Sequence, residues 1–230
     1  LLLTREPVFA CFDDQGFGFF FVLTGDVGQF IYGQVGQFVA GVHAGFCQFG
    51  NELDSEAFEI GDQRRREMAI SLLAAIDRHV AAEIVERLLA NGEKVRILDN
   101  FSTGKPANVA PFKGRVELVE GDLRDPAALA RAVEGCEVVY QQAALRSVPR
   151  SIDDPLANND VNVTGILQLL VASKRAGVRR VVYASSSSVY GDDPTLPKVE
   201  TQTPRPISPY AASKIMGEYY CRIYSQLYGL

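Results

Sequence analysis

Histidine and cysteine, the usual side chains of structural metal sites, are scarce in this sequence. Its 230 residues contain two histidines and four cysteines. They stand at His43, His79, Cys11, Cys47, Cys136 and Cys221. No two cysteines form a C-x-x-C pair, and neither histidine has a partner at the spacing of a zinc site. We therefore expect no metal site, no disulfide framework, and free thiols in a reducing cytoplasm.

Long apolar runs and dense basic runs are also missing. The most apolar early stretch, Phe19 to Leu23, is far shorter than the ~20 residues that span a bilayer. The net charge is −5, without a basic run, which argues against nucleic acid or an anionic membrane surface as a partner. We expect a cytoplasmic protein with a sizeable core, since 47% of its residues are apolar.

The two parts of the chain differ in pattern. Residues 1–70 show no sustained periodicity and stay unassigned; a non-native or poorly ordered segment is one interpretation. Residues 71–230 alternate between apolar strands and amphipathic helices. Strands are expected at 95–98, 116–119, 137–140 and 180–184, and helices at 82–89, from Asp125-Pro126 onward, at 155–176 and at 209–228. This order predicts an α/β fold with a doubly wound, Rossmann-like parallel sheet.

A tyrosine and a lysine stand four residues apart near the C-terminal end, as Tyr210-x-x-x-Lys214. Within the predicted helix 209–228 they share one face, one turn apart. A nearby ammonium would favour the phenolate and lower the tyrosine pKa from about 10, which would make Tyr210 a proton acceptor near neutral pH. The spacing alone is a weak signal, because an amphipathic helix with a surface lysine gives the same pattern.

Four serines, Ser185 to Ser188, follow the strand 180–184. Serines in a loop are usually turn residues. Here they come directly after an apolar strand, at the carboxyl end where ligands of parallel sheets bind. Together with Tyr210 and Lys214 downstream, they predict a hydrogen-bonding site for a substrate oxygen.

Several further stretches, taken in order, are similar to one family. They are 97–104 (ILDNFSTG), 120–125 (EGDLRD), 142–145 (QAAL), 147–151 (SVPRS), 162–165 (NVTG), the serine run with 189–191 (VYG), and 208–210 (SPY) with Lys214. Residues 83–230 thereby resemble the extended short-chain dehydrogenase/reductase family, that is, the NAD-dependent epimerases and dehydratases. Within that family they resemble the UDP-N-acetylglucosamine and UDP-glucose 4-epimerases.

The resemblance implies NAD as the cofactor and assigns residues to it. Asp99, with Asn100 beside it, would bind the adenosine ribose, because a carboxylate there accepts from both hydroxyls and repels a 2′-phosphate. The other cofactor residues so implied are Asp122 and Leu123 at the adenine, Ala143 and Ala144 where the backbone passes close, and Tyr210 and Lys214 at the nicotinamide ribose.

The resemblance also implies a reaction. Tyr210 would take the proton of the sugar 4-hydroxyl while a hydride leaves carbon 4 for NAD. Return of both to the opposite face of the 4-keto sugar would invert that centre. Ser186 would bond the reacting hydroxyl, Ser187 would assist it, and Ser147 would touch the sugar.

Two partners are implied with it. One is a nucleotide-sugar substrate. The other is a second copy of the chain, because family members often dimerise through two long helices. Here these helices are 155–176 and 209–228, which would form a four-helix contact.

The glycine-rich turn of the family, G-x-x-G-x-x-G after the first strand, is missing. Its glycines fall on Ala75, Arg78 and Ala81, and Asp77 between them would repel a phosphate. The stretch 20–31 imitates a strand and a glycine turn, but no helix pattern follows it. The bound cofactor would therefore lack the usual cradle for its pyrophosphate.

The chain ends at Leu230, before the further strands and the small substrate domain of family members, so we expect a partial chain. Three interpretations stay open. The first is an NAD-dependent nucleotide-sugar 4-epimerase. The second is an inactive fragment, or a non-catalytic member that binds cofactor or a partner, and the third is an NAD-dependent reductase of a small carbonyl compound. A dehydratase is disfavoured, because Ser187 and Ser188 stand where that class carries its acid pair.

Overall fold

A single seven-stranded sheet organises the described residues of the computed structural model, which are 7–12, 19–24, 69–73 and 80–230. Its strand order is β1-β2-β7-β6-β3-β4-β5. The strands are β1 (Pro7–Phe12), β2 (Phe19–Thr24), β3 (Ala69–Leu73), β4 (Lys94–Asp99), β5 (Val116–Glu120), β6 (Cys136–Gln141) and β7 (Arg180–Ala184).

The five strands from β7 to β5 are all parallel, which confirms the predicted doubly wound sheet. In chain order they run outward in both directions from β3, so a crevice forms at the carboxyl ends where the order reverses, between β3 and β6. β1 and β2 form an antiparallel hairpin, and β2 pairs antiparallel with β7 through Phe21 and Val22. The sequence did not predict this hairpin within 1–70, because a short apolar run does not specify its partner.

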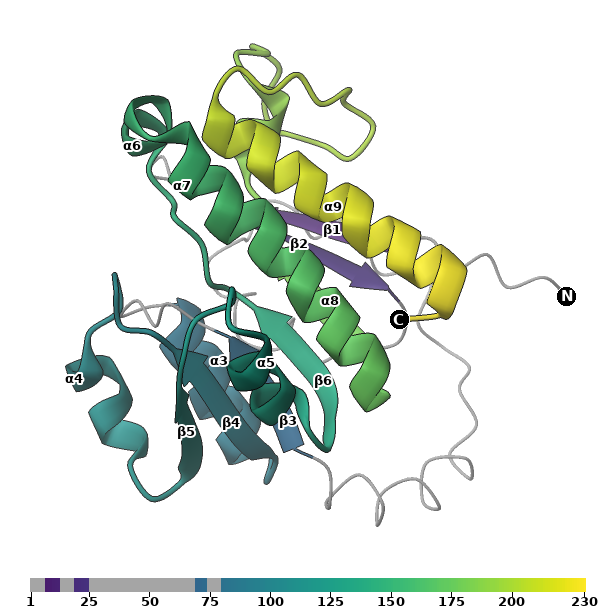
Figure 1. Ribbon diagram of the computed structural model, residues 1–230. Coiled ribbons are helices and arrows are strands. Elements are labelled where there is room, and N and C mark those ends of the chain that lie inside the picture. Colours follow the sequence, from purple (N-terminus) through teal and green to yellow (C-terminus); the bar gives the residue numbers. More distant parts are fainter. Residues whose placement is uncertain (1–6, 13–18, 25–68, 74–79) are drawn as a thin grey trace, which may run out of the picture.

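Helices cover both faces of the sheet (Figure 1). The helices are α3 (Val80–Ala90), α4 (Pro106–Val109), α5 (Pro126–Val133), α6 (Val148–Asp153), α7 (Pro155–Asn159), α8 (Gly165–Ala176) and α9 (Pro209–Tyr228). Three short turns are the 3-10 turns η2 (Ala110–Phe112) and η4 (Ser187–Tyr190) and the π-turn η3 (Asp160–Thr164). α8 and α9 lie side by side over one face, and the predicted segments 180–184 and 209–228 are confirmed with the same bounds.

Two apolar layers follow from the alternation of side chains along the strands. On one face, Leu98 and Val139 pack with α5 and α8. On the other face, Ile97 and Val138 pack with α3 and with Phe112 of η2. Consecutive residues of a strand point to opposite faces of the sheet and pack into different layers. The strands are therefore apolar on both faces, as expected of parallel strands between two layers of helices.

The single helix predicted at 155–176 is divided. Asp154 caps α7 by accepting from Ala157 N at 3.0 Å. Between α7 and α8, the π-turn η3 has the hydrogen bonding of a π-helix in place of that of an α-helix. A π-turn rotates the following side chains relative to a regular helix and is frequent at functional sites. The helical periodicity of the sequence carries no signal for it. α8 ends as expected, at Gly177 in the left-handed region with φ +73°.

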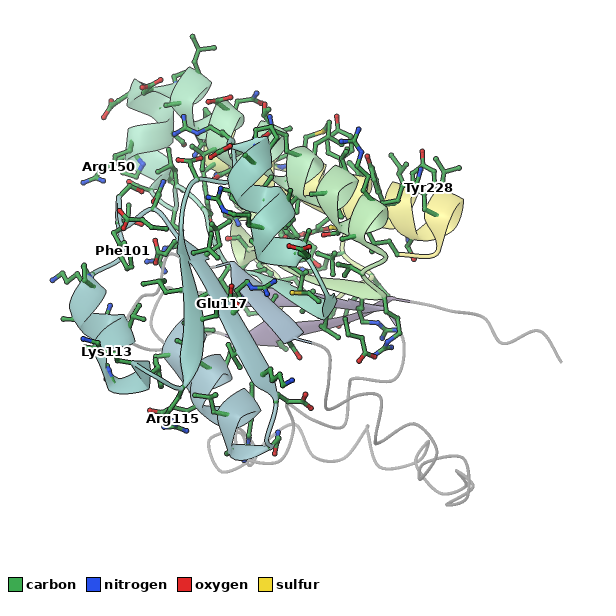
Figure 2. The ribbon with its side chains drawn as sticks, turned by 60° about the horizontal axis from the view of Figure 1, so that its bottom comes forward. Phe101, Lys113, Arg115, Glu117, Arg150 and Tyr228 are labelled. Atoms are coloured by element: carbon green, nitrogen blue, oxygen red, sulfur yellow. The ribbon has the colours of Figure 1, made fainter. Side chains whose placement is uncertain are left out.

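The carboxyl ends of the parallel strands form the edge that carries the site. Figure 2 labels Phe101, just beyond β4, and Arg150 on α6, which follows β6; both lie toward this edge. Arg115, which precedes β5, lies at the opposite end of the sheet. The loops after β4, β5, β6 and β7 therefore meet on one side.

Candidate active site

α9 carries a tyrosine and a lysine on its first two turns. Ser208 caps the helix by accepting from Ala211 N at 3.1 Å, and Pro209 occupies the first turn, where no backbone N–H is needed. Tyr210 and Lys214 are 8% and 3% exposed. Both therefore point into the molecule, which excludes the alternative of a surface lysine on an amphipathic helix.

The carboxyl end of β7 meets this face of α9. Lys214 Nζ donates to the carbonyl oxygen of Ala184 at 3.0 Å, and the Ser186 hydroxyl lies near enough to the Tyr210 phenol to favour its ionised form and so to lower its pKa. Ser186 Oγ accepts from the backbone N and the hydroxyl of Ser188, at 3.2 and 2.8 Å. Because both acceptor positions of Ser186 are used, its own proton is left for a further acceptor on the side of the phenol.

Burial dominates the acid–base properties of this cluster. It raises the pKa of Tyr210, and the Ser186 hydrogen bond and the charge of Arg146 oppose that rise only in part. It also lowers the pKa of Lys214 to about 7, helped by Arg146 and opposed by Glu218. The expectation that the ammonium lowers the tyrosine pKa is therefore wrong, because desolvation of the phenolate outweighs its charged neighbours.

A cavity of about 240 Å³ opens beside the carboxyl ends of β4 and β5 and the loop after β6. It brings together six of the residues that the resemblance assigned to the cofactor: Asp99, Asn100, Asp122, Leu123, Ala143 and Ala144. Its wall also contains Ser102, Thr103, Arg124, Ala157 and Val161, to which the sequence argument gave no role. These residues come from segments far apart in the chain, so their proximity follows from the sheet topology.

Asp99 ends β4 and is 3% exposed. Its Oδ1 accepts from Phe101 N at 2.8 Å, and Asn100 Oδ1 accepts from Ser102 N at 3.0 Å. Phe101 has φ +52°, a left-handed conformation that is uncommon for a bulky side chain. The two side-chain bonds hold this tight turn, which keeps the Asp99 carboxylate at the cavity, where ribose hydroxyls could donate to it.

Asp122 is held by a dense set of hydrogen bonds. It accepts from Asn100 Nδ2 at 2.7 Å and from the backbone and guanidinium of Arg124 at 2.8 to 2.9 Å. Arg124 also donates to Asp160 of η3 at 3.0 Å. These bonds, above all the one from the Arg124 side chain, hold the pKa of Asp122 well below its usual range. Asp122 therefore remains a carboxylate at the wall of the cavity, with all four of its lone-pair positions used by Asn100 and Arg124.

Asn162 joins the loop after β6 to α9. It accepts from Leu145 N at 2.8 Å and donates to Leu145 O and to Ser213 Oγ, both at 3.1 Å. Ser213 donates in turn to the carbonyl oxygen of Tyr210 at 2.7 Å. Sequence reasoning quoted Asn162 within a family stretch but gave it no role, because the π-turn that directs it inward leaves no periodic pattern.

Ser147 and Ser187, which were expected to contact the sugar, and Ala81, which aligns with a glycine of the family's turn, remain to be placed. Ser147 caps α6 by accepting from Arg150 N at 3.2 Å, and Ser187 begins η4; their contacts with a sugar stay predictions. Of the three positions aligned with the glycines of the family's turn, Ala81 lies within α3, where its side chain is buried at 2% exposure. The remaining positions of that turn lie outside the described residues, as do the glycines of the stretch 20–31.

From the composition we also expected neither a metal site nor a membrane-spanning segment. In the part of the chain that the structure describes, no three His, Cys, Asp or Glu side chains are placed to hold a metal ion. Within the same residues, no helix is both long and apolar enough to cross a bilayer. Cys136 and Cys221 are free thiols, while Cys11, Cys47, His43 and His79 lie outside the residues whose side chains are described.

The sequence matches a known family over most of this site. Residues 79–230 match the model of the NAD-dependent epimerase/dehydratase family. The UDP-glucose 4-epimerase of Mycolicibacterium smegmatis is 41% identical over 155 residues, which are 66% of this chain and 50% of that protein. The chain thus spans about half the length of the curated relatives it matches.

Two solved structures are similar in fold. The UDP-N-acetylglucosamine 4-epimerase of Methanobrevibacter ruminantium M1, solved in complex with UDP-N-acetylmuramic acid, is 34% identical with a TM-score of 0.66 over 71% of this chain and 52% of that one. The UDP-glucose 4-epimerase of Thermus thermophilus, solved with NAD, is 39% identical with a TM-score of 0.64 over the same shares.

Proposed function

Because the chain belongs to the NAD-dependent epimerase/dehydratase family, we propose that it carries the cofactor-binding and acid–base part of a nucleotide-sugar 4-epimerase. The observation that carries this proposal is the buried cluster of Tyr210, Ser186 and Lys214 at the end of β7, where Lys214 donates to the Ala184 carbonyl. NAD is the cofactor of this family; when bound, it accepts the hydride of a sugar carbon and returns it.

The described residues fit the adenosine half of NAD. Asp99 offers a carboxylate for the two ribose hydroxyls, and the same charge would repel the 2′-phosphate of NADP. Asp122 and Leu123 line the cavity where the adenine ring would lie, and the bonds from Arg124 hold Asp122 in place. Ala143 and Ala144 line the cavity with small side chains, so a ligand can approach the backbone between them.

The proton of the sugar hydroxyl would pass to Tyr210. After its two bonds with Ser188, Ser186 has one proton left, which can go either to the Tyr210 phenolate or to the reacting oxygen of the sugar. Lys214 Nζ lies 5.9 Å from the centre of the Tyr210 ring and is held there by the Ala184 carbonyl. From this position Lys214 could donate to the hydroxyls of the nicotinamide ribose, as the resemblance implies.

The residues after β7 favour epimerisation among the reactions of the family. Ser187 and Ser188 occupy the positions at which the sequence argument expects an acid pair in dehydratases. A hydroxyl is too weak an acid to assist loss of water from a neighbouring sugar carbon. The names of the relatives, which refer to UDP-glucose and UDP-N-acetylglucosamine, support a UDP-sugar as the substrate class.

We also propose that two copies associate through the α8–α9 face. Four apolar side chains of α9, Met216, Tyr219, Ile223 and Leu227, are between 39% and 66% exposed and follow helical spacing. An apolar stripe of this kind is self-complementary across a two-fold axis. Light scattering after gel filtration should give a dimer that Ile223→Glu converts to a monomer, while Glu86→Lys on the exposed face of α3 leaves it intact. A monomeric wild-type chain would contradict this part.

The catalytic proposal is tested by incubating the chain with NAD and UDP-glucose and following the anomeric proton signals by NMR. We expect the C4 epimer to appear, and Tyr210→Phe to slow its formation by about 100-fold or more. Tyr228→Phe, at the exposed end of the same helix and outside the apolar stripe, is the matched control and should leave the rate unchanged. A folded chain that binds NAD but forms no epimer would instead indicate the non-catalytic member, and NADH oxidation by a small carbonyl compound would indicate the reductase.

A further inference from the structure

A half-buried carboxylate, Glu218, follows the tyrosine–lysine pair on α9 and has no task in the proposed reaction. Glu218 follows Lys214 by four residues on α9, so their Cβ atoms lie about 5–6 Å apart on one helix face. Its Oε1 accepts a hydrogen bond from the hydroxyl of Ser185, which is 2% exposed. A carboxylate enclosed in this way is costly unless a cation or donor compensates it.

Glu218 belongs to a regular series of contacts between α9 and the end of β7. The contacts come from three successive turns of the helix. Tyr210 lies near Ser186, Lys214 donates to the Ala184 carbonyl, and Glu218 accepts from the Ser185 hydroxyl.

Gly217 makes this close approach possible. A Cβ there would lie 2.3 Å from the ring and the hydroxyl of Tyr183, whose hydroxyl donates to Lys214 O at 3.4 Å. Helix α9 therefore packs closely against β7 along these contacts, and the side chains of Tyr210, Lys214 and Glu218 are held against the end of the strand.

The charges around Lys214 explain why it needs a counter-charge. Its Nζ has the Ala184 carbonyl as a neutral acceptor and lies 5.1 Å from the centre of the Tyr183 ring. Arg146, from the loop after β6, disfavours the ammonium, whereas Glu218 favours it; the half-buried Cys221 carries no charge near neutral pH, because burial raises the pKa of its thiol to about 12. Burial works against the charged forms of both partners, since it also raises the pKa of Glu218, a rise that the Ser185 bond, Arg222 and Lys214 oppose.

We propose that Glu218, oriented by Ser185, is a positioning residue that keeps Lys214 protonated and fixed beside Tyr210. The proposal deepens the proposed function, because that function assigns Lys214 to the nicotinamide ribose, to which an ammonium donates more strongly than a neutral amine. Glu218 acts through Lys214 and contacts neither sugar nor cofactor. It also gives the first serine of the run a task that differs from that of Ser186.

The test is a direct titration of Lys214 by NMR in the chain without cofactor. The sequence contains six lysines. Five of them, Lys94, Lys105, Lys113, Lys174 and Lys198, are exposed or half-buried, so Lys214 is the outlier when the lysine Cε atoms are labelled with ¹³C. Its signal is assigned by its loss in Lys214→Arg. The wild-type signal should titrate with a pKa of about 7.

Glu218→Gln preserves the size of the side chain and an oxygen for Ser185, but removes the charge. We expect the Lys214 pKa to fall by about one to two units, the effect of one opposite charge about 6 Å away at an effective dielectric constant of about 20. Ser185→Ala should shift it in the same direction by less, because the carboxylate remains. Glu86→Gln, on the exposed face of α3, is the matched control and should leave the titration unchanged.

A Lys214 pKa that stays at the wild-type value or rises in folded Glu218→Gln would overturn the proposal and leave Glu218 as a neutral link between helix and strand. If Glu218→Gln does not fold, an unchanged titration in folded Ser185→Ala overturns it equally. The titration needs neither NAD nor sugar, so its outcome is separate from the epimerisation assay. A shifted Lys214 in a chain that forms no epimer would support this inference and count against the proposed function alone.

Discussion

Replacing Asn162 by alanine tests the connection between the loop after β6 and α9. Asn162 is 4% exposed and makes two hydrogen bonds with the Leu145 backbone and one with Ser213. Alanine leaves the buried N–H of Leu145 without its acceptor, which costs about 1–3 kcal/mol. Leu145 O keeps its bond from Asn158 Nδ2 at 3.1 Å, so the other two losses are smaller, about 0.5–1 kcal/mol each. We expect the free energy of unfolding to fall by about 3 kcal/mol.

Urea unfolding followed by circular dichroism measures this loss, provided that the slope of the transition stays constant. Asn159→Ala is the matched control, because Asn159 lies three residues earlier and is exposed. It should change stability by less than about 0.5 kcal/mol, as surface substitutions usually do. If Asn162→Ala costs no more than Asn159→Ala, the assignment of a connecting role to these hydrogen bonds is wrong.

Three further substitutions probe packing, charge and helix termination. Gly217→Ala adds a methyl group 2.3 Å from the Tyr183 ring. This overpacking should lower the free energy of unfolding by about 1–3 kcal/mol, which calorimetry would detect as a lower Tm. Folding lowers the Lys214 pKa from 10.5 to about 7, so the unfolded state binds more protons between these values and wild-type stability rises with pH across that window. Lys214→Met should therefore be more stable than wild type in urea at pH 7 and below, with an advantage that shrinks toward pH 10.5; an advantage independent of pH would contradict this. Arg96 Nη1 donates to carbonyls at the end of α5 and to Glu134 O at 2.6 Å, so Arg96→Met should lose about 1–3 kcal/mol in the same assay.

Local signals in the sequence predicted much of the architecture. The bounds of β7 and α9 agree with the predicted segments because each boundary has a chemical cause: Ser208 and Pro209 begin the helix, and Gly229, with φ +72°, ends it. The same holds for α5, where Asp125 accepts from Ala127 N at 2.9 Å. A cap or a left-handed glycine acts within one turn, so a single sequence contains the whole signal.

Contacts between distant segments could not be predicted in this way. The bond between Arg124 and Asp160 joins residues 36 positions apart, and that between Ser185 and Glu218 joins residues 33 apart. Neither pair has a periodic or local pattern. The resemblance to a family named residues that bind, but the residues that hold them in place, such as Asn162, emerge only once the chain is folded.

The rise of the Tyr210 pKa is a third case. Sequence spacing predicts the distance between the phenol and the ammonium, and hence a favourable charge. It does not predict how completely both groups are removed from water. Burial is a property of the whole fold, and at Tyr210 it outweighs the charges.

The central claim is that the cavity after β4 and β5 holds the adenosine half of NAD through Asp99. Calorimetric titration of NAD into the chain tests it most directly, with Asp99→Ala as the variant and Asp153→Ala, at an exposed carboxylate of α6, as the control. We predict saturable binding to the wild type and the control, weakened about tenfold or more in Asp99→Ala, because hydrogen bonds to a charged group contribute about 1.5–3 kcal/mol. Equal affinities in all three folded chains, or no saturable binding to the folded wild type, would contradict the account.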